Sequence, residues 1–189
     1  MAIGSASGYA SPGSVNEGAS MPQPDISVLY GAHLRAMTAR ADRALAAQGY
    51  DGLIIASGSL RYLYLDDNSY PFKPNPRYRS WVPDGSPDCF IVYRPGGRPI
   101  LVFHQPDDYW YLPPALPQGY WVGSFDLRVV RSPAELRQST GGGGRWAVLG
   151  EPTAVTEGLG DHDPAGLTAL FDYARAAKTP YEIECMARA

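Results

Sequence analysis

The feature that most constrains the fold is a helical segment followed at once by a fully apolar strand. Asp25 or Ser27 can cap a helix that runs to about Gln48, and Gly49 is suited to end it. Residues 53–56, Leu-Ile-Ile-Ala, carry apolar side chains toward both faces of any sheet they join. This pair predicts an α/β domain whose sheet is covered on both faces. The apolar face of the helix consists of Tyr30, Leu34, Met37, Ala41 and Leu45.

Later segments predict more strands and three short helices. Residues 90–93 and 100–103 flank Arg-Pro-Gly-Gly-Arg-Pro, a strong hairpin signal. Residues 120–125, 127–130 and 146–149 are predicted as further strands, and the glycines at 141–144 as a flexible connection. Helices are predicted to begin after three capping residues: Ser132, Asp163 and Thr179, each followed by proline.

The two ends of the chain differ from the middle. Residues 1–24 are mostly Gly, Ser and Ala, which predicts a disordered tail or an appended remnant, with Met21 as a plausible initiator. At the other end a helix with a well-defined start at Pro180 has only nine residues before Ala189. Two interpretations stay open: a longer protein cut within this helix, or a terminal helix docked on the domain.

Composition excludes several functional classes. The formal net charge of -3 gives no general attraction to nucleic acid or to an anionic membrane. No apolar run approaches the roughly 20 residues that span a bilayer, and the start does not resemble a secretory signal. Cys89 and Cys185 are expected to be buried reduced thiols. We therefore expect a soluble, cytoplasmic protein that binds neither membrane nor nucleic acid.

No catalytic constellation is evident in the sequence. The three histidines, His33, His104 and His162, are widely separated and form no His-Glu-x-x-His pattern, so we expect no metal site within this chain. Asp161-His162-Asp163 is interpreted as a polar loop with Asp163 as helix cap. Ser57, Ser59 and Cys89 have no histidine partner by spacing, so nucleophilic catalysis is unsupported. The sequence predicts no catalytic residue.

Residues 62–81 are the most unusual stretch, because three prolines alternate with large aromatic rings. Such rings must pack on the domain or contact a partner. Asp66 is expected to stabilise a turn, whereas Asp67 is a candidate to receive a cationic group of a ligand. Trp110, in a later proline-bounded loop, is either buried or an interface anchor. A weaker alternative is a stacking platform for single-stranded nucleic acid, built by basic and aromatic residues between Tyr70 and Trp81.

A series of short motifs, in order along the chain, resembles the amino-terminal domain of bacterial Xaa-Pro dipeptidases (prolidases) and the related organophosphorus acid anhydrolases. The resemblance begins near Ile26 and extends to the end of the chain. The motifs are Val28-Leu29-Tyr30 with His33-Leu34, Asp51-Gly52, Ser57-Gly58, Leu65-Asp66-Asp67, Tyr70-Pro71-Phe72-Lys73, Asn75-Pro76, Trp81, Gln105-Pro106, Asp108-Tyr109-Trp110, Phe125-Asp126, Leu149-Gly150-Glu151-Pro152, Ala177-Lys178-Thr179-Pro180-Tyr181-Glu182 and Cys185-Met186.

The resemblance implies a three-layer-like α/β domain of the creatinase/prolidase amino-terminal type, with a mixed sheet flanked by helices, over residues 25–178. Residues 179–189 would begin the first helix of a missing carboxy-terminal metallopeptidase domain. In the family that domain holds two manganese-type ions on two Asp, one His and two Glu, and it hydrolyses dipeptides ending in proline. The parent protein would be a homodimer.

In this family two residues of the amino-terminal domain reach the active site of the other subunit. Asp67 matches the acid near the amino end of the substrate, and Trp110 matches a tryptophan that walls the pocket. The chain alone would then be a dimerisation and pocket-completing module without catalytic activity. The alternatives are a free-standing domain that binds peptide or nucleic acid, and a truncated gene remnant.

Overall fold

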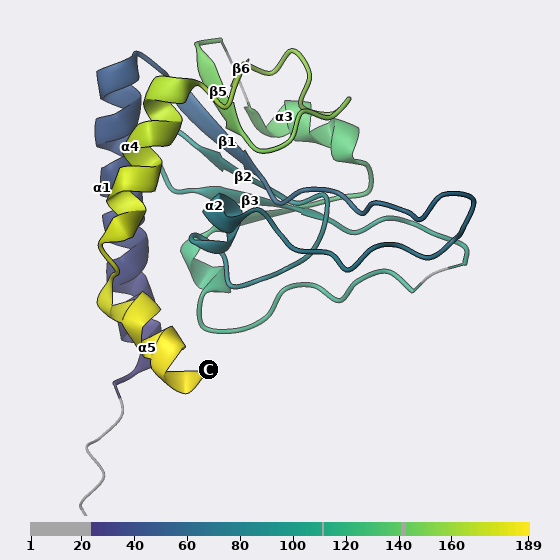
Figure 1. Cartoon of the computed structure of the whole chain (residues 1–189), viewed down its shortest axis with the longest axis horizontal. Coiled ribbons are helices and arrows are strands. Elements are labelled where there is room, and N and C mark those ends of the chain that lie inside the picture. The colour runs from purple at the N-terminus through teal and green to yellow at the C-terminus, as the bar shows by residue number, and fades with distance from the viewer. Residues whose placement is uncertain (1–23, 111, 141–142) are drawn as a thin grey trace, which may run out of the picture.

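A computed structural model describes residues 24–110, 112–140 and 143–189 (Figure 1). The predicted tail at residues 1–23 and the glycines at 141 and 142 lie outside the described residues.

The centre of the domain is a mixed six-stranded sheet with the order β4-β3-β2-β1-β5-β6. The pairs β1/β2 and β2/β3 are antiparallel, whereas β1/β5, β3/β4 and β5/β6 are parallel. β2 therefore runs opposite to the other five strands, whose carboxyl ends share one edge of the sheet. The strands are β1 (Gly52–Ala56), β2 (Phe90–Tyr93), β3 (Ile100–His104), β4 (Asp126–Val130), β5 (Trp146–Leu149) and β6 (Asp161–His162).

Helices cover both faces of the sheet, so the predicted α/β class is confirmed. One face packs against α1 (Ile26–Gln48), α4 (Ala165–Ala176) and α5 (Pro180–Arg188), which lie together along one side of the domain (Figure 1). The short helices η2 (Pro133–Glu135) and α3 (Leu136–Thr140) cover the opposite face. Alternate strand residues feed the two cores: Leu53 and Ile55 face α1, whereas Ile54 and Ala56 face α3.

The long helix α1 forms as the sequence predicts. The side chain of Asp25 accepts a hydrogen bond from the backbone N–H of Ser27, and Gly49 ends the helix at a φ of 68°. All five residues of the predicted apolar face are buried. The hairpin of β2 and β3 is likewise confirmed.

One predicted strand, residues 120–125, is wrong. The structure instead has a turn and the short helix η1 (Val122–Ser124), and strand β4 begins at Asp126. Trp121 and Phe125 are both buried with their ring centroids 6.1 Å apart, which fits a helical spacing of four residues. The aromatic residues of this segment suggested a strand, but their side chains are buried around a compact turn.

The predicted cap Asp163 is also wrong. Pro164 occupies the cap position of α4 without a side-chain hydrogen bond, and residues 161–162 form the short strand β6 rather than a loop. Asp163 has a φ of 39° and accepts a hydrogen bond from the backbone N–H of Gly150 (3.3 Å). Its carboxylate thus ties the end of β5 to the start of α4 instead of capping the helix.

Helix α5 docks on α1 through a polar junction. Thr179 forms the predicted capping box with Glu182, and Tyr181 is buried. The imidazole of His33, itself buried, lies between the hydroxyl of Thr179 (Nδ1 to Oγ1, 2.8 Å) and the carbonyl oxygen of Ser80 (Nε2 to O, 2.6 Å). One histidine therefore holds together α1, the residue after α2 (Pro76–Arg79) and the start of α5.

The two cysteines are free thiols, as predicted. Cys89 is buried, but Cys185 is only half-buried, so the prediction that both thiols are buried is wrong for Cys185. Across the part of the chain that the structure describes, no helix is both long and apolar enough to cross a membrane.

Candidate functional site

Two long loops leave the same edge of the sheet, one after β1 and one after β3. The two strands run in the same direction, because each is antiparallel to β2. The loops extend away from the helical side of the domain (Figure 1). Ligand sites of open α/β sheets lie outside the carboxyl ends of strands, so this edge is where a site is expected.

The loop after β1 folds back on itself as a small hairpin. Tyr62 and Ser69 form an isolated bridge, and the N–H of Tyr70 donates to the carbonyl of Arg61 (2.8 Å). At the tip, one carboxylate oxygen of Asp66 accepts bonds from the N–H and the side-chain amide of Asn68, both at 2.8 Å. The backbone bond from Asn68 is the main cause that lowers the pKa of Asp66. The turn-stabilising role predicted for Asp66 is confirmed.

Asp67 is exposed and lines a hollow of about 620 Å³ between the two loops, which we call the Asp67 hollow. The other wall of the hollow comes from the loop after β3, including Pro106, Asp108 and Leu112. Among the described residues no cation forms an ion pair with Asp67; the side-chain amide of Asn68 lies 3.5 Å from its carboxylate. The carboxylate is therefore open to a cationic group.

Trp110 is 83% exposed, so it is not buried packing. Its ring packs edge-on against Tyr109 with centroids 4.9 Å apart, and its backbone N–H donates to the carboxylate of Asp108 (2.7 Å). Trp110 does not line the Asp67 hollow. The structure thus brings together the two loops that carry Asp67 and Trp110, but it does not bring the two side chains into one cavity.

The two loops expose large apolar side chains, which together we call the loop surface. Tyr64, Leu65 and Leu112 are 92%, 89% and 95% exposed. Apolar exposure of this kind is common on surfaces that contact a partner or a ligand. The loop surface comprises Tyr62, Tyr64, Leu65, Tyr70, Tyr109, Trp110, Leu112 and Leu116.

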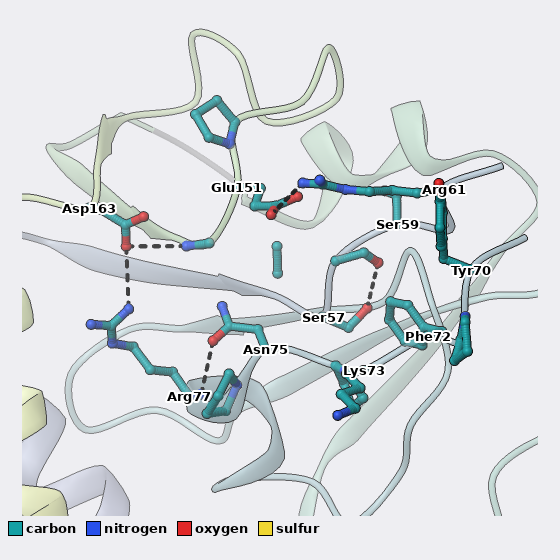
Figure 2. Close-up of a pocket in the computed structure, with 17 residues that line it drawn as sticks. Ser57, Ser59, Arg61, Tyr70, Phe72, Lys73, Asn75, Arg77, Glu151 and Asp163 are labelled. Atoms are coloured by element: carbon teal, nitrogen blue, oxygen red, sulfur yellow. Dashed lines mark hydrogen bonds and ion pairs between the residues drawn. The ribbon is translucent and has the colours of Figure 1, made fainter. Parts of the chain in front are cut away.

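A second cavity, of about 650 Å³, lies at the carboxyl ends of β1 and β5, and the sequence analysis missed it (Figure 2). We call it the crevice. Arg61 and Glu151 form an ion pair of 2.6 Å across it, and Arg77 pairs with Asp163 at 3.7 Å. Two turns in the sequence could have indicated the crevice: Ser-Gly after β1 and Gly-Glu-Pro after β5. They end two adjacent parallel strands.

Only part of the stacking platform considered for nucleic acid is exposed. Tyr78 and Trp81 are completely or almost completely buried, at 0% and 1% exposure. Arg77 pairs with Asp172 (2.9 Å), and Arg79 donates to a backbone carbonyl. Two of the four rings that would stack on bases, those of Tyr78 and Trp81, are therefore part of the core, whereas Tyr70 stays exposed.

The candidate nucleophiles do not meet a histidine base. Ser57 donates to the carbonyl of Gly58 (3.2 Å), and burial raises the pKa of the Cys89 thiol to about 12. Ser59 donates to one carboxylate oxygen of Asp88 (2.5 Å), and His104 lies 4.0 Å from the other. The hydroxyl of Ser59 thus donates its proton to a carboxylate and not to an imidazole. In the described ranges no three His, Cys, Asp or Glu residues gather as metal ligands.

Comparison with known proteins identifies the domain. The family model for the Xaa-Pro dipeptidase N-terminal domain matches residues 28–173. An Xaa-Pro dipeptidase of Xanthomonas campestris pv. campestris (strain B100) is 44% identical over 168 residues, which are 88% of this chain and 38% of that protein. An Xaa-Pro dipeptidase of Stenotrophomonas maltophilia (strain K279a) is 40% identical over 171 residues, 89% of this chain and 39% of that protein. The chain spans less than half the length of these relatives. It belongs to the Xaa-Pro dipeptidase N-terminal domain family.

Proposed function

We propose that this chain is the dimerisation and pocket-completing domain of an Xaa-Pro dipeptidase, which hydrolyses dipeptides with carboxy-terminal proline. The hydrolytic step would belong to a carboxy-terminal metallopeptidase domain with two manganese-type ions, and helix α5 would lead into it. The observation that carries the proposal is the loop surface, because exposed tyrosine, tryptophan and leucine side chains favour contact with a second copy.

The two predicted site residues have the properties that this role needs. The open carboxylate of Asp67 can receive the ammonium group of a dipeptide. The exposed ring of Trp110 can form a flat wall of a neighbouring subunit's pocket, which excludes water and longer peptides. Since the two side chains do not share a cavity within one chain, a contribution to a pocket of the partner subunit fits their placement.

A cytoplasmic location is part of the proposal. Free thiols persist in reducing compartments, and both cysteines here are unpaired. The alternative of a free-standing peptide-binding domain uses the same loop surface. The nucleic-acid form of that alternative is disfavoured, because two of its four rings, Tyr78 and Trp81, are buried.

A chimera tests the proposal. This chain replaces the aligned amino-terminal part of the Xanthomonas campestris relative, and hydrolysis of a proline dipeptide is measured with Mn²⁺. We expect activity in the chimera and none in the 189-residue chain alone. Asp67→Asn should raise KM by about tenfold or more, the size of one lost charged hydrogen bond. Asp107→Asn, an exposed acid in the other loop, is the matched control and should leave KM unchanged.

Subunit mixing decides whether the contribution crosses the dimer. One chimera carries Asp67→Asn, and a second keeps Asp67 but has its metal ligands removed, so each is inactive or impaired alone. Mixed dimers should regain activity, because the second subunit supplies Asp67 to the intact metal site of the first. Activity no greater than that of the separate proteins, in a mixture shown to exchange subunits, would refute the cross-subunit role.

A further inference from the structure

The crevice lies where two adjacent strands send the chain to opposite faces of the sheet. The chain leaving β1 enters the core beneath α1, where Tyr78 and Trp81 are buried. The chain leaving the neighbouring parallel strand β5 packs on the opposite face through Val155 and Leu159. Diverging connections of this kind leave an opening between them at the strand ends, and open α/β sheets bind ligands in such openings.

A glycine keeps the floor of the crevice open. Gly150 follows β5 directly and has a φ of 130°, which side-chain-bearing residues rarely adopt. A Cβ atom there would lie 3.1 Å from the amide nitrogen of Asn75 and 3.2 Å from the Cβ of Ala56. The space above the strand ends is therefore available to a ligand and not occupied by a side chain of β5.

The charged residues that line the crevice leave one positive charge without a partner. Arg61 is paired with Glu151, and Arg77 lies between Asp163 (3.7 Å) and Asp172 (2.9 Å). Among the described residues no ion pair or hydrogen bond engages the ammonium group of Lys73, which lines the same crevice and is exposed. A small anion would give this ammonium group a partner.

The wall next to Lys73 is aromatic. Tyr70 and Phe72 line the crevice, and in Figure 2 the ring of Phe72 lies near Lys73 and the ring of Tyr70 near Arg61. A flat or cyclic apolar group packs well against such rings. The crevice thus offers an ammonium group and an apolar surface at neighbouring positions.

We propose that the crevice binds a small monocarboxylate whose flat apolar group packs on Phe72 and Tyr70 while its carboxylate meets Lys73. This site is separate from the Asp67 hollow, since neither Asp67 nor Trp110 lines the crevice. The two sites also select opposite charges: Asp67 offers a carboxylate, whereas Lys73 offers a cation.

Titration of the ¹⁵N-labelled 189-residue chain with benzoate tests the site by NMR. We expect shifts of the backbone amides of Gly58 and Gly150, which line the crevice. Benzamide, which lacks the charge, and acetate, which lacks the ring, should each bind at least about tenfold more weakly. Benzylammonium, with the opposite charge, should not shift these amides.

The variant K73Q should weaken benzoate binding by about tenfold, the loss of one charge-assisted contact. Lys73 is exposed, so this change should leave the fold intact. The matched control is K178Q, the only other lysine of the chain, whose ammonium donates to the carbonyl of Arg175 away from the crevice. Benzoate affinity of K178Q should equal that of the unchanged protein.

Three results would each overturn the proposal: no shift of the crevice amides, equal binding of benzoate and benzamide, or equal binding to K73Q and the unchanged protein. Equal binding of acetate would remove the aromatic part of the ligand class. Tyr70 belongs to both the crevice and the loop surface, but none of these readouts involves hydrolysis or dimerisation, so failure of this proposal leaves the proposed function standing.

Discussion

His33 joins three elements, and its two hydrogen bonds define which of its nitrogens carries the proton. The carbonyl oxygen of Ser80 can only accept a hydrogen bond, so Nε2 of His33 must carry a proton, and in the neutral ring Nδ1 accepts from the hydroxyl of Thr179. The proton of the neutral ring then lies on Nε2 and is donated to the carbonyl of Ser80. We predict that His33 stabilises the docking of α5 only in this neutral form.

The loss of stability on removing the imidazole can be worked out from its two hydrogen-bond partners. In His33→Ala the carbonyl of Ser80 loses its donor and the hydroxyl of Thr179 loses its acceptor. Each unpaired buried group costs about 1–3 kcal/mol, so unfolding should become about 3 kcal/mol easier. In a domain of this size that lowers the melting temperature by about 6–12 °C. His33→Gln, which can donate and accept at similar positions, should recover part of the loss.

The pKa of His33 determines in which direction its contribution to stability changes with pH. Burial, as the main cause, lowers the pKa of His33 below its ordinary value, although the hydrogen bond to Ser80 opposes the shift. Between the lowered pKa and about 6.5, the unfolded chain therefore binds a proton that the folded chain does not. The stabilisation should be complete above about pH 6.5 and should decrease as the pH falls below it.

Urea unfolding of the 189-residue chain at about pH 7.5 and pH 5.5 measures the effect. His33→Gln should reduce the difference between the two pH values, whereas His104→Gln, at a partly exposed histidine, should leave in place the part that His33 causes. The tautomer can be checked by ¹⁵N NMR of the ring. A ring that titrates above the ordinary histidine pKa, or a His33→Gln protein with an unchanged pH difference, would refute this account.

Three further predictions concern single residues. Gly150→Ala should lower the free energy of unfolding by about 1–3 kcal/mol because of its φ of 130°, whereas Gly123→Ala, with open space at the Cβ position, should stay within about 0.5 kcal/mol by thermal melting. Tyr30→Phe removes the buried hydrogen bond to the carbonyl of Trp81 (2.6 Å) and should cost about 1–3 kcal/mol in urea unfolding. Cys89, whose pKa burial raises to about 12, should resist iodoacetamide at pH 8 in the folded protein and react in denaturant; labelling of both cysteines at equal rates in the native state would contradict its burial.

The sequence predicted elements wherever local chemistry and burial agree. The α1 caps and the β2–β3 hairpin are confirmed, because Asp25, Gly49 and the Pro-Gly-Gly turn act over a few residues. Strand β6 and the role of Asp163 were missed, because they depend on pairing with β5 and on contact with Arg77, far away in sequence. The same reason hid the crevice, since its walls are adjacent only after β1 and β5 have paired.

Asp67 and Trp110 illustrate a different limit. Their exposure agrees with a role at a surface, but a single chain does not show what their side chains would contact. The family resemblance supplied that role, because it places both residues in the pocket of a second copy. A residue that acts in a partner's site has no signal in its own chain beyond an unexplained exposed side chain.

The small hairpin after β1 explains how one segment can serve two sites of opposite charge. Tyr62 and Ser69 pair across the hairpin and both line the Asp67 hollow, whereas their neighbours Arg61 and Tyr70 both line the crevice. Side chains of successive strand residues point to opposite faces, and cross-strand partners share a face. The hairpin is thus a common wall with one face toward each cavity. A shift in its pairing by one residue would exchange the two sets of side chains, so both sites depend on the same register.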